Sequence, residues 1–144
     1  MSADLAIGSP EAARLAPQPP HLEPRALPKW RALLESHWRA RLERVTELSL
    51  AYHDAEEAAA WPDPSGLPAA SPGTRSAQAR PLLRQAVAER RALAEIEAAL
   101  SRLAAGRFGR CERCGGAVSA ARLTRVPQAR YCGSCETGAE YHGP

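Results

Sequence analysis

The four cysteines of the chain form two pairs near its C-terminal end, and no other feature limits the possible fold as strongly. They stand as Cys111-x2-Cys114 and Cys132-x2-Cys135, with seventeen residues between the pairs. Two C-x2-C turns joined by a loop can direct four thiolates at one ion, and Zn²⁺ prefers four ligands in a tetrahedron. We therefore predict one structural Zn²⁺ held by these four cysteines. Because four thiolates leave no open ligand position, the metal is expected to support folding and not catalysis.

Other uses of the cysteines agree less well with the rest of the sequence. Disulfides would require an oxidising compartment, and the first 25 residues contain neither the apolar stretch nor the basic start of a secretory signal. A redox C-x-x-C pair belongs beside a βαβ pattern, which the sequence lacks. No segment approaches the roughly 18 apolar residues of a transmembrane helix. We expect a cytoplasmic protein with reduced cysteines and no membrane segment.

The N-terminal residues 1–27 do not have the pattern of a helix or strand. They are rich in Pro, Ala and small polar residues, and their apolar residues follow no sustained period. Such a composition predicts a disordered arm. The alternative is a short motif that docks on the helices that follow.

Two segments have the apolar spacing of long amphipathic helices, at about 29–60 and 80–105. In the first, apolar residues recur at steps of three or four from Trp30 to Ala59, and Leu42 is one of them. The second has the same spacing with one charged interruption, Glu89. Each helix can bury its apolar stripe only against the other.

The segments around these helices complete the predicted architecture. Prolines at 62 and 64 end the first helix and begin a loop over 61–79, and Gly106 ends the second helix as a C-cap. We predict a mostly α fold, an antiparallel coiled-coil helical hairpin over 28–105. A four-cysteine zinc finger follows at 106–138, and residues 139–144 form a tail.

The finger segment contains several short motifs besides the cysteines. It includes Gly106-Arg-Phe108-Gly109-x-Cys111, then Pro127-x-Ala129 ahead of the second cysteine pair. In these motifs, and in the hairpin before them, the chain resembles the DksA/TraR family of bacterial C4-type zinc-finger proteins. Arg125 departs from the family, which usually has a small residue there. The resemblance implies a transcription regulator that binds RNA polymerase and inserts the tip of its hairpin through the secondary channel.

The tip motif of the better-known family members is missing. Those members have two aspartates in a D-x-x-D stretch, whereas Ser71 and Thr74, followed by Arg75, stand in the most similar stretch here. Two acids nearby, Asp54 and Asp63, could instead approach a bound magnesium or a basic side chain of the partner, although a solvated acidic helix end would have the same composition. All five residues are candidates for partner binding through an atypical tip.

Some family members also bind the alarmone ppGpp through basic residues. The matching positions here are Glu95, Val126 and Glu136. Because carboxylates repel a pyrophosphate, we expect no ppGpp binding by that mode.

A second hypothesis concerns the arginines around the finger. Seven arginines lie between residues 102 and 130 against one acid, Glu112; they are Arg102, Arg107, Arg110, Arg113, Arg122, Arg125 and Arg130. Such a face could dock nucleic acid or an acidic protein, or could simply be solvated or offset the charge of the zinc thiolates. The family binds polymerase and not DNA, so we do not expect direct DNA binding. We expect no enzymatic activity either, because His37 and His53 lie sixteen residues apart on one predicted helix and His142 lies in the tail, so no nucleophile, base and orienting group are expected to converge.

Overall fold

A computed structural model describes residues 17–60 and 72–139, and these residues are mostly helical. The described residues form no β-strand, and a single isolated bridge joins Arg110 and Ala117. The elements in chain order are two 3₁₀ turns, η1 (Pro20–Leu22) and η2 (Pro24–Ala26), and four helices, α2 (Leu27–Ala60), α3 (Pro72–Ala104), α4 (Ala120–Arg125) and α5 (Gly133–Ala139).

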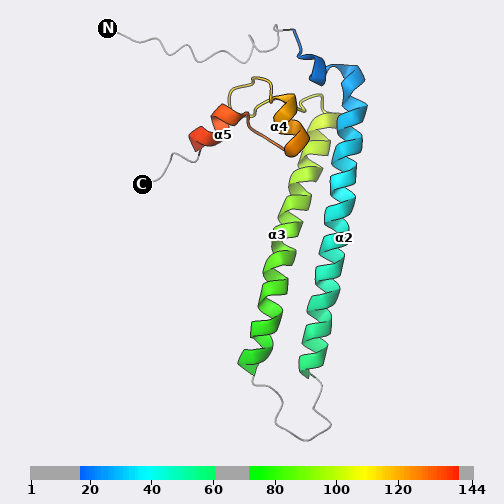
Figure 1. Ribbon diagram of the computed structural model, residues 1–144, viewed down its shortest axis with the longest axis vertical. Coiled ribbons are helices and arrows are strands. Elements are labelled where there is room, and N and C mark those ends of the chain that lie inside the picture. The colour runs from blue at the N-terminus through cyan, green and yellow to red at the C-terminus, as the bar shows by residue number, and fades with distance from the viewer. Residues whose placement is uncertain (1–16, 61–71, 140–144) are drawn as a thin grey trace, which may run out of the picture. The chain divides into compact units, whose positions relative to one another are not determined.

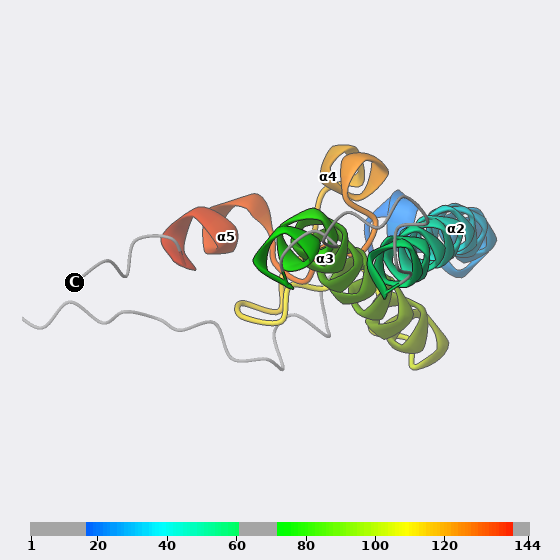
Figure 2. The ribbon, with the colours of Figure 1, turned by 90° about the horizontal axis from the view of Figure 1, so that it is seen from below.

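The long helices α2 and α3 run antiparallel and side by side, as both views show (Figure 1, Figure 2). This confirms the predicted hairpin followed by a small finger. The described chain divides into two compact units. Residues 17–35 and 96–139 form what we call the finger unit, and residues 36–60 and 72–95 form the hairpin unit.

The predicted N-terminal arm differs from the structure in its second half. Residues 20–26 form the two 3₁₀ turns, each with a proline at its first position, and α2 begins directly after them at Leu27. Leu22 is 4% exposed and belongs to the core of the finger unit. This agrees with the alternative of a short docked motif. Residues 1–16 lie outside the described part of the chain.

Helix α3 begins at Pro72 and not near residue 80, so the predicted loop is shorter than 61–79. The helix starts on a proline, whose missing N–H costs nothing at that position. It then continues through Pro81, which removes only one backbone donor and whose side chain is exposed. The remaining loop residues, 61–71, lie outside the described chain.

The two helices of the hairpin unit meet along a thin apolar seam of buried residues, namely Val45, Leu48, Ala79 and Ala86. Leu42, which the spacing placed in this seam, is 38% exposed. Arg41 takes that level instead, and its Nη1 donates to Glu89 Oε2 at 2.7 Å. Leu42 follows Trp30 by three successive steps of four, and each such step turns about 40° beyond a full turn of a helix with 3.6 residues per turn, so Leu42 lies about 120° around the helix from Trp30. The charged interruption at Glu89 is thus one half of an ion pair between the helices.

The finger unit has a denser core, built from the N-terminal end of α2, the C-terminal end of α3 and the finger. Leu34, Ile96, Val118, Leu123 and Pro127 are its largest fully buried side chains. Between the rings of Trp30 on α2 and Phe108 in the finger the centroid distance is 6.1 Å. These contacts fix the two helix ends beside each other.

The C-terminal end of α3 turns into the finger at Gly106, as predicted. Gly106 has φ +70°, a conformation that side chains disfavour. Its N–H donates to Leu103 O at 3.2 Å, and Arg107 N–H donates to Arg102 O at 2.8 Å. This pair of hydrogen bonds is a Schellman motif, which satisfies the last carbonyls of the helix.

Candidate metal centre

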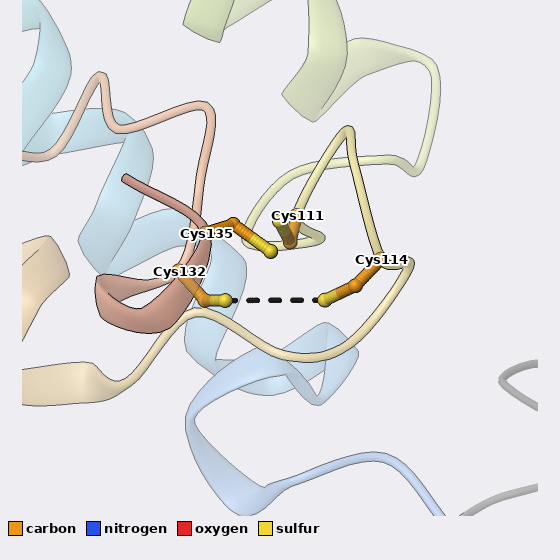
Figure 3. Close-up of side chains that lie close together, drawn as sticks. All are labelled: Cys111, Cys114, Cys132 and Cys135. Atoms are coloured by element: carbon orange, nitrogen blue, oxygen red, sulfur yellow. Dashed lines mark hydrogen bonds between the residues drawn. The ribbon is translucent and has the colours of Figure 1, made fainter. Parts of the chain in front are cut away.

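The four cysteines converge on one point, from two separate segments of the finger (Figure 3). Their sulfurs all lie within 4.8 Å of one another, and the Sγ atoms of Cys114 and Cys132 are 3.9 Å apart. A tetrahedron with zinc–sulfur bonds of 2.3 Å places its sulfurs about 3.8 Å apart. The donor set and its spacing therefore fit one Zn²⁺ and leave no position for a substrate.

The first pair is held by a tight turn between Cys111 and Gly116. Cys111 N–H donates to Gly116 O at 2.8 Å, and Gly115 N–H donates to Cys111 O at 2.9 Å. Gly115 has φ +72°, so the turn favours glycine there. The N–H of Gly116 also lies 3.4 Å from Cys114 Sγ, a contact that stabilises a thiolate.

The second pair lies at the start of α5. Cys132 precedes the helix, and its carbonyl accepts from the N–H groups of Cys135 at 3.1 Å and Glu136 at 3.0 Å. Gly133 does not have a positive φ, and a Cβ there would meet nothing within 4 Å. A backbone hydrogen bond joins the segments that carry the two pairs, from Glu112 N–H to Arg130 O at 2.9 Å.

The thiols affect one another's ionisation because they are so close. Burial of Cys111 raises the pKa of its thiol, but backbone hydrogen bonds from Cys114 and Cys132 outweigh burial and lower that pKa to about 6. The hydrogen bond with the Cys132 side chain, together with burial and nearby Cys111, raises the pKa of Cys135 to about 12. Four sulfurs at this spacing do not readily all ionise alone, and a divalent cation removes that repulsion.

Three arginines near the metal centre bind other parts of the finger. Arg113 Nη1 donates to Cys135 O at 3.2 Å, and its guanidinium lies 5.7 Å from the centre of the Tyr131 ring. Arg122 Nε donates to Tyr131 O at 3.0 Å, and its Nη2 pairs with the Glu136 carboxylate. Arg130 Nη1 lies 3.4 Å from both carboxylate oxygens of Glu112. These side chains crosslink the two cysteine segments.

Arg102 joins α3 to the finger from inside the core. It is the buried charged residue of the described chain, at 7% exposure. Its Nη2 donates to Gln128 O at 3.2 Å, and its Nη1 lies 3.8 Å from the Glu112 carboxylate. Of the seven arginines noted in the sequence, four therefore have structural contacts, whereas Arg107 and Arg125 are exposed and Arg110 is half-buried.

The 3₁₀ turns also hold the finger, whereas the alternative drawn from the sequence placed the docked arm on the helices. Val118 O can only accept, so the 2.8 Å contact with His21 Nε2 places a proton on that nitrogen. Trp30 Nε1 on α2 donates to His21 O at 2.6 Å. Leu22 packs over Gly109, where an added Cβ would come within 2.2 Å of Leu22 Cδ2. The Phe108-Gly109 motif was visible in the sequence, but its partner in the arm was not.

The other predicted site residues lie away from the metal centre. Asp54 is an exposed residue of α2 in the hairpin unit. Thr74 and Arg75 belong to the first turns of α3, and Asp63 and Ser71 lie outside the described residues. Their role in partner binding stays a prediction.

The finger and the rest of the chain are similar to known proteins. Residues 106–141 match the family model of the prokaryotic dksA/traR C4-type zinc finger. The RNA polymerase-binding transcription factor DksA of Escherichia coli K12 is 32% identical over 139 residues, which cover 94% of this chain and 85% of the relative. The chain belongs to the DksA/TraR family. The family's finger is of the C4 type, which confirms the four-cysteine Zn²⁺ centre predicted from the sequence.

Another relative and a solved structure are also similar to this chain. DksA of Haemophilus influenzae is 34% identical over 88 residues, which cover 61% of this chain and 57% of the relative. The structure of transcription factor DksA2 from Pseudomonas aeruginosa matches with a TM-score of 0.72 over 91% of this chain and 95% of that one. At 24% identity, this last match shows the shared fold alone. The named relatives are transcription factors, in agreement with the expectation of a protein that is not an enzyme.

Among the described residues, no helix combines the length and the apolar character that crossing a bilayer requires.

Proposed function

We propose that this protein is a cytoplasmic transcription regulator that binds RNA polymerase. The observation that carries the proposal is the similarity over 94% of the chain to a factor named for polymerase binding. The likeness includes both parts of the architecture, the helical hairpin and the C4 finger, and not the metal motif alone.

The contacts of the finger unit give zinc a role in this function. Trp30 packs against Phe108, and Arg102 bonds to Gln128, so the start of α2 and the end of α3 are both attached to the metal-bound finger. The chain between these ends must leave and return as a hairpin. Zinc therefore acts at a distance from the partner, by keeping the two helix ends together.

The contact with polymerase is proposed to involve the atypical hairpin tip. Asp54 and Asp63 supply the carboxylates that D-x-x-D supplies in other members, and Ser71, Thr74 and Arg75 occupy the matching stretch. We propose that ppGpp does not bind through the family's positions. Glu136 pairs there with Arg122, and Val126 is 37% exposed without a charge to offer a phosphate.

The test is co-purification of the zinc-loaded full-length protein with the RNA polymerase of the same organism. We expect a stable complex, and we expect replacement of residues 61–71 by a glycine-serine linker of equal length to weaken its effect on transcription. Failure of the intact protein to bind polymerase contradicts the proposal. Binding and regulation that are both indifferent to the replacement contradict the role of the tip alone.

The alternative, a finger that docks nucleic acid through an arginine face, has less support from the contacts. Four of the arginines of that face are bound within the finger unit. Affinity for DNA that falls steeply with salt, and that is lost on charge reversal at Arg107 and Arg125, would favour it over polymerase binding.

A further inference from the structure

A groove with an apolar floor lies between α2 and α3 in the hairpin unit. It has a volume of about 210 Å³ and is lined by Tyr52 and His53 from α2 and by Leu83, Ala86, Val87 and Arg90 from α3. That space is sufficient for a large side chain of a partner. The hydrogen bond with Glu56 raises the pKa of Tyr52.

Two large apolar side chains at the edge of the groove are exposed to solvent. Leu83 is 47% exposed and Val87 is 43% exposed, and the two lie one helical turn apart on α3. Both border the groove, whereas the exposed Leu50 of α2 does not. A pair of large apolar side chains at the edge of a hollow marks a place where a partner buries surface.

The α3 side of the groove is cationic. Arg90 lines it, and Arg80, Arg84 and Arg91 are also exposed on the same stretch of α3. None of these four arginines is in an ion pair with another residue of the described chain. The one acid between residues 80 and 94, Glu89, is engaged by Arg41. The α3 side of the groove therefore favours an occupant that carries negative charge, although Glu56 of α2 is hydrogen-bonded to Tyr52 on the other side.

We propose that the groove receives an apolar side chain from an acidic segment of RNA polymerase, with Val87 and Leu83 contacting the apolar group and Arg90 the carboxylate. This inference rests on the proposed function and assigns to it a contact surface separate from the tip. A protein segment fits better than nucleic acid, because a phosphate backbone would satisfy Arg90 but leave the apolar floor uncovered.

The test measures the affinity of zinc-loaded full-length variants for RNA polymerase. Val87→Asp and Arg90→Glu should each raise Kd by about tenfold or more, the effect expected for a central interface residue. Leu50→Asp and Arg39→Glu are the matched controls, since both positions are exposed on α2 of the same unit outside the groove lining. They should change Kd by less than about threefold. Circular dichroism confirms that all four variants remain helical.

Each outcome separates this inference from the proposed function. If the wild type does not bind polymerase, both fall. If the wild type binds and the groove variants match their controls, the groove assignment is wrong and the proposed function stands. If Arg90→Glu instead weakens retention on duplex DNA while polymerase binding is unchanged, the surface serves nucleic acid. A photocrosslinker in place of Val87 should map to an acidic polymerase segment, and crosslinking only to a basic segment contradicts the proposal.

Discussion

The finger unit and the hairpin unit have the same helices but differ in what stabilises them. In the finger unit, four cysteine sulfurs, a buried arginine and the docked 3₁₀ turns make directional contacts around a core that includes Trp30 and Phe108. In the hairpin unit, the described helices meet along a seam of small and medium side chains with one ion pair across it. The difference indicates that the finger unit contributes most of the stability, and that the hairpin unit provides the surface for a partner.

That division explains where the exposed apolar residues occur. The hairpin unit exposes four large apolar residues, Leu42, Leu50, Leu83 and Val87. Among the described residues of the finger unit, only Val126 is a large apolar residue that is comparably exposed. A short two-helix seam leaves most of each helix facing solvent, so those faces are available for a partner. We therefore expect changes in the finger unit to alter folding and changes on the hairpin unit to alter binding.

The largest expected effect comes from Cys114→Ser. Loss of one thiolate should abolish zinc binding, and because structural zinc contributes folding energy directly, the finger unit should unfold. The helical signal of the hairpin unit should largely survive. Native mass spectrometry measures the zinc content, and circular dichroism measures the helix.

The control for this change is Ser134→Ala, at an exposed residue inside the second cysteine pair that is not a ligand. It should retain one zinc ion and full stability. Full zinc retention by Cys114→Ser would contradict the four-ligand centre, and near-complete loss of helix would contradict independence of the hairpin unit.

The next effect compares two glycines in the finger unit, Gly109 and Gly106. Both have a positive φ, but only Gly109 lies against another side chain, Leu22. Gly109→Ala should lower the free energy of unfolding by about 2 to 5 kcal/mol, from backbone strain plus overpacking. Gly106→Ala should cost about 1 to 2 kcal/mol, from strain alone. Urea unfolding monitored by tryptophan fluorescence measures both, and equal costs would show that the 3₁₀ turns do not dock on the finger.

A smaller effect is expected in the hairpin unit for Glu89→Gln. The Arg41 and Glu89 side chains are 42% and 20% exposed, so loss of their ion pair should cost about 0.5 to 1 kcal/mol and less at high salt. Glu47→Gln removes a more exposed pair, with Arg44, and should cost nothing measurable. Thermal unfolding at two salt concentrations measures both variants. A cost above about 2 kcal/mol at Glu89 would mean that the seam depends on charge more than on its apolar residues.

The features that the sequence predicted correctly are those set by local chemistry. Two C-x2-C pairs allow few arrangements, so the metal centre followed from spacing, and Gly106 has the backbone conformation of the predicted C-cap. Periodic apolar residues predicted both long helices. The sequence was wrong where the local preference for helix or loop is weak, as at the start of α3 at Pro72.

The features that the sequence did not predict depend on contacts between distant residues. Leu22 and Gly109, and Arg41 and Glu89, are paired only through the fold, and neither member of a pair indicates its partner. The arginines around the finger looked like a basic surface because their acceptors are mainly backbone carbonyls, which have no signature in a sequence.

The most direct test of the contrast between the two units is hydrogen exchange of the full-length protein with and without a zinc chelator. We predict that chelation removes protection from residues 17–35 and 96–139, while residues 36–60 and 72–95 keep most of theirs. Simultaneous loss of protection throughout both units, or no loss in the finger unit, would contradict the account.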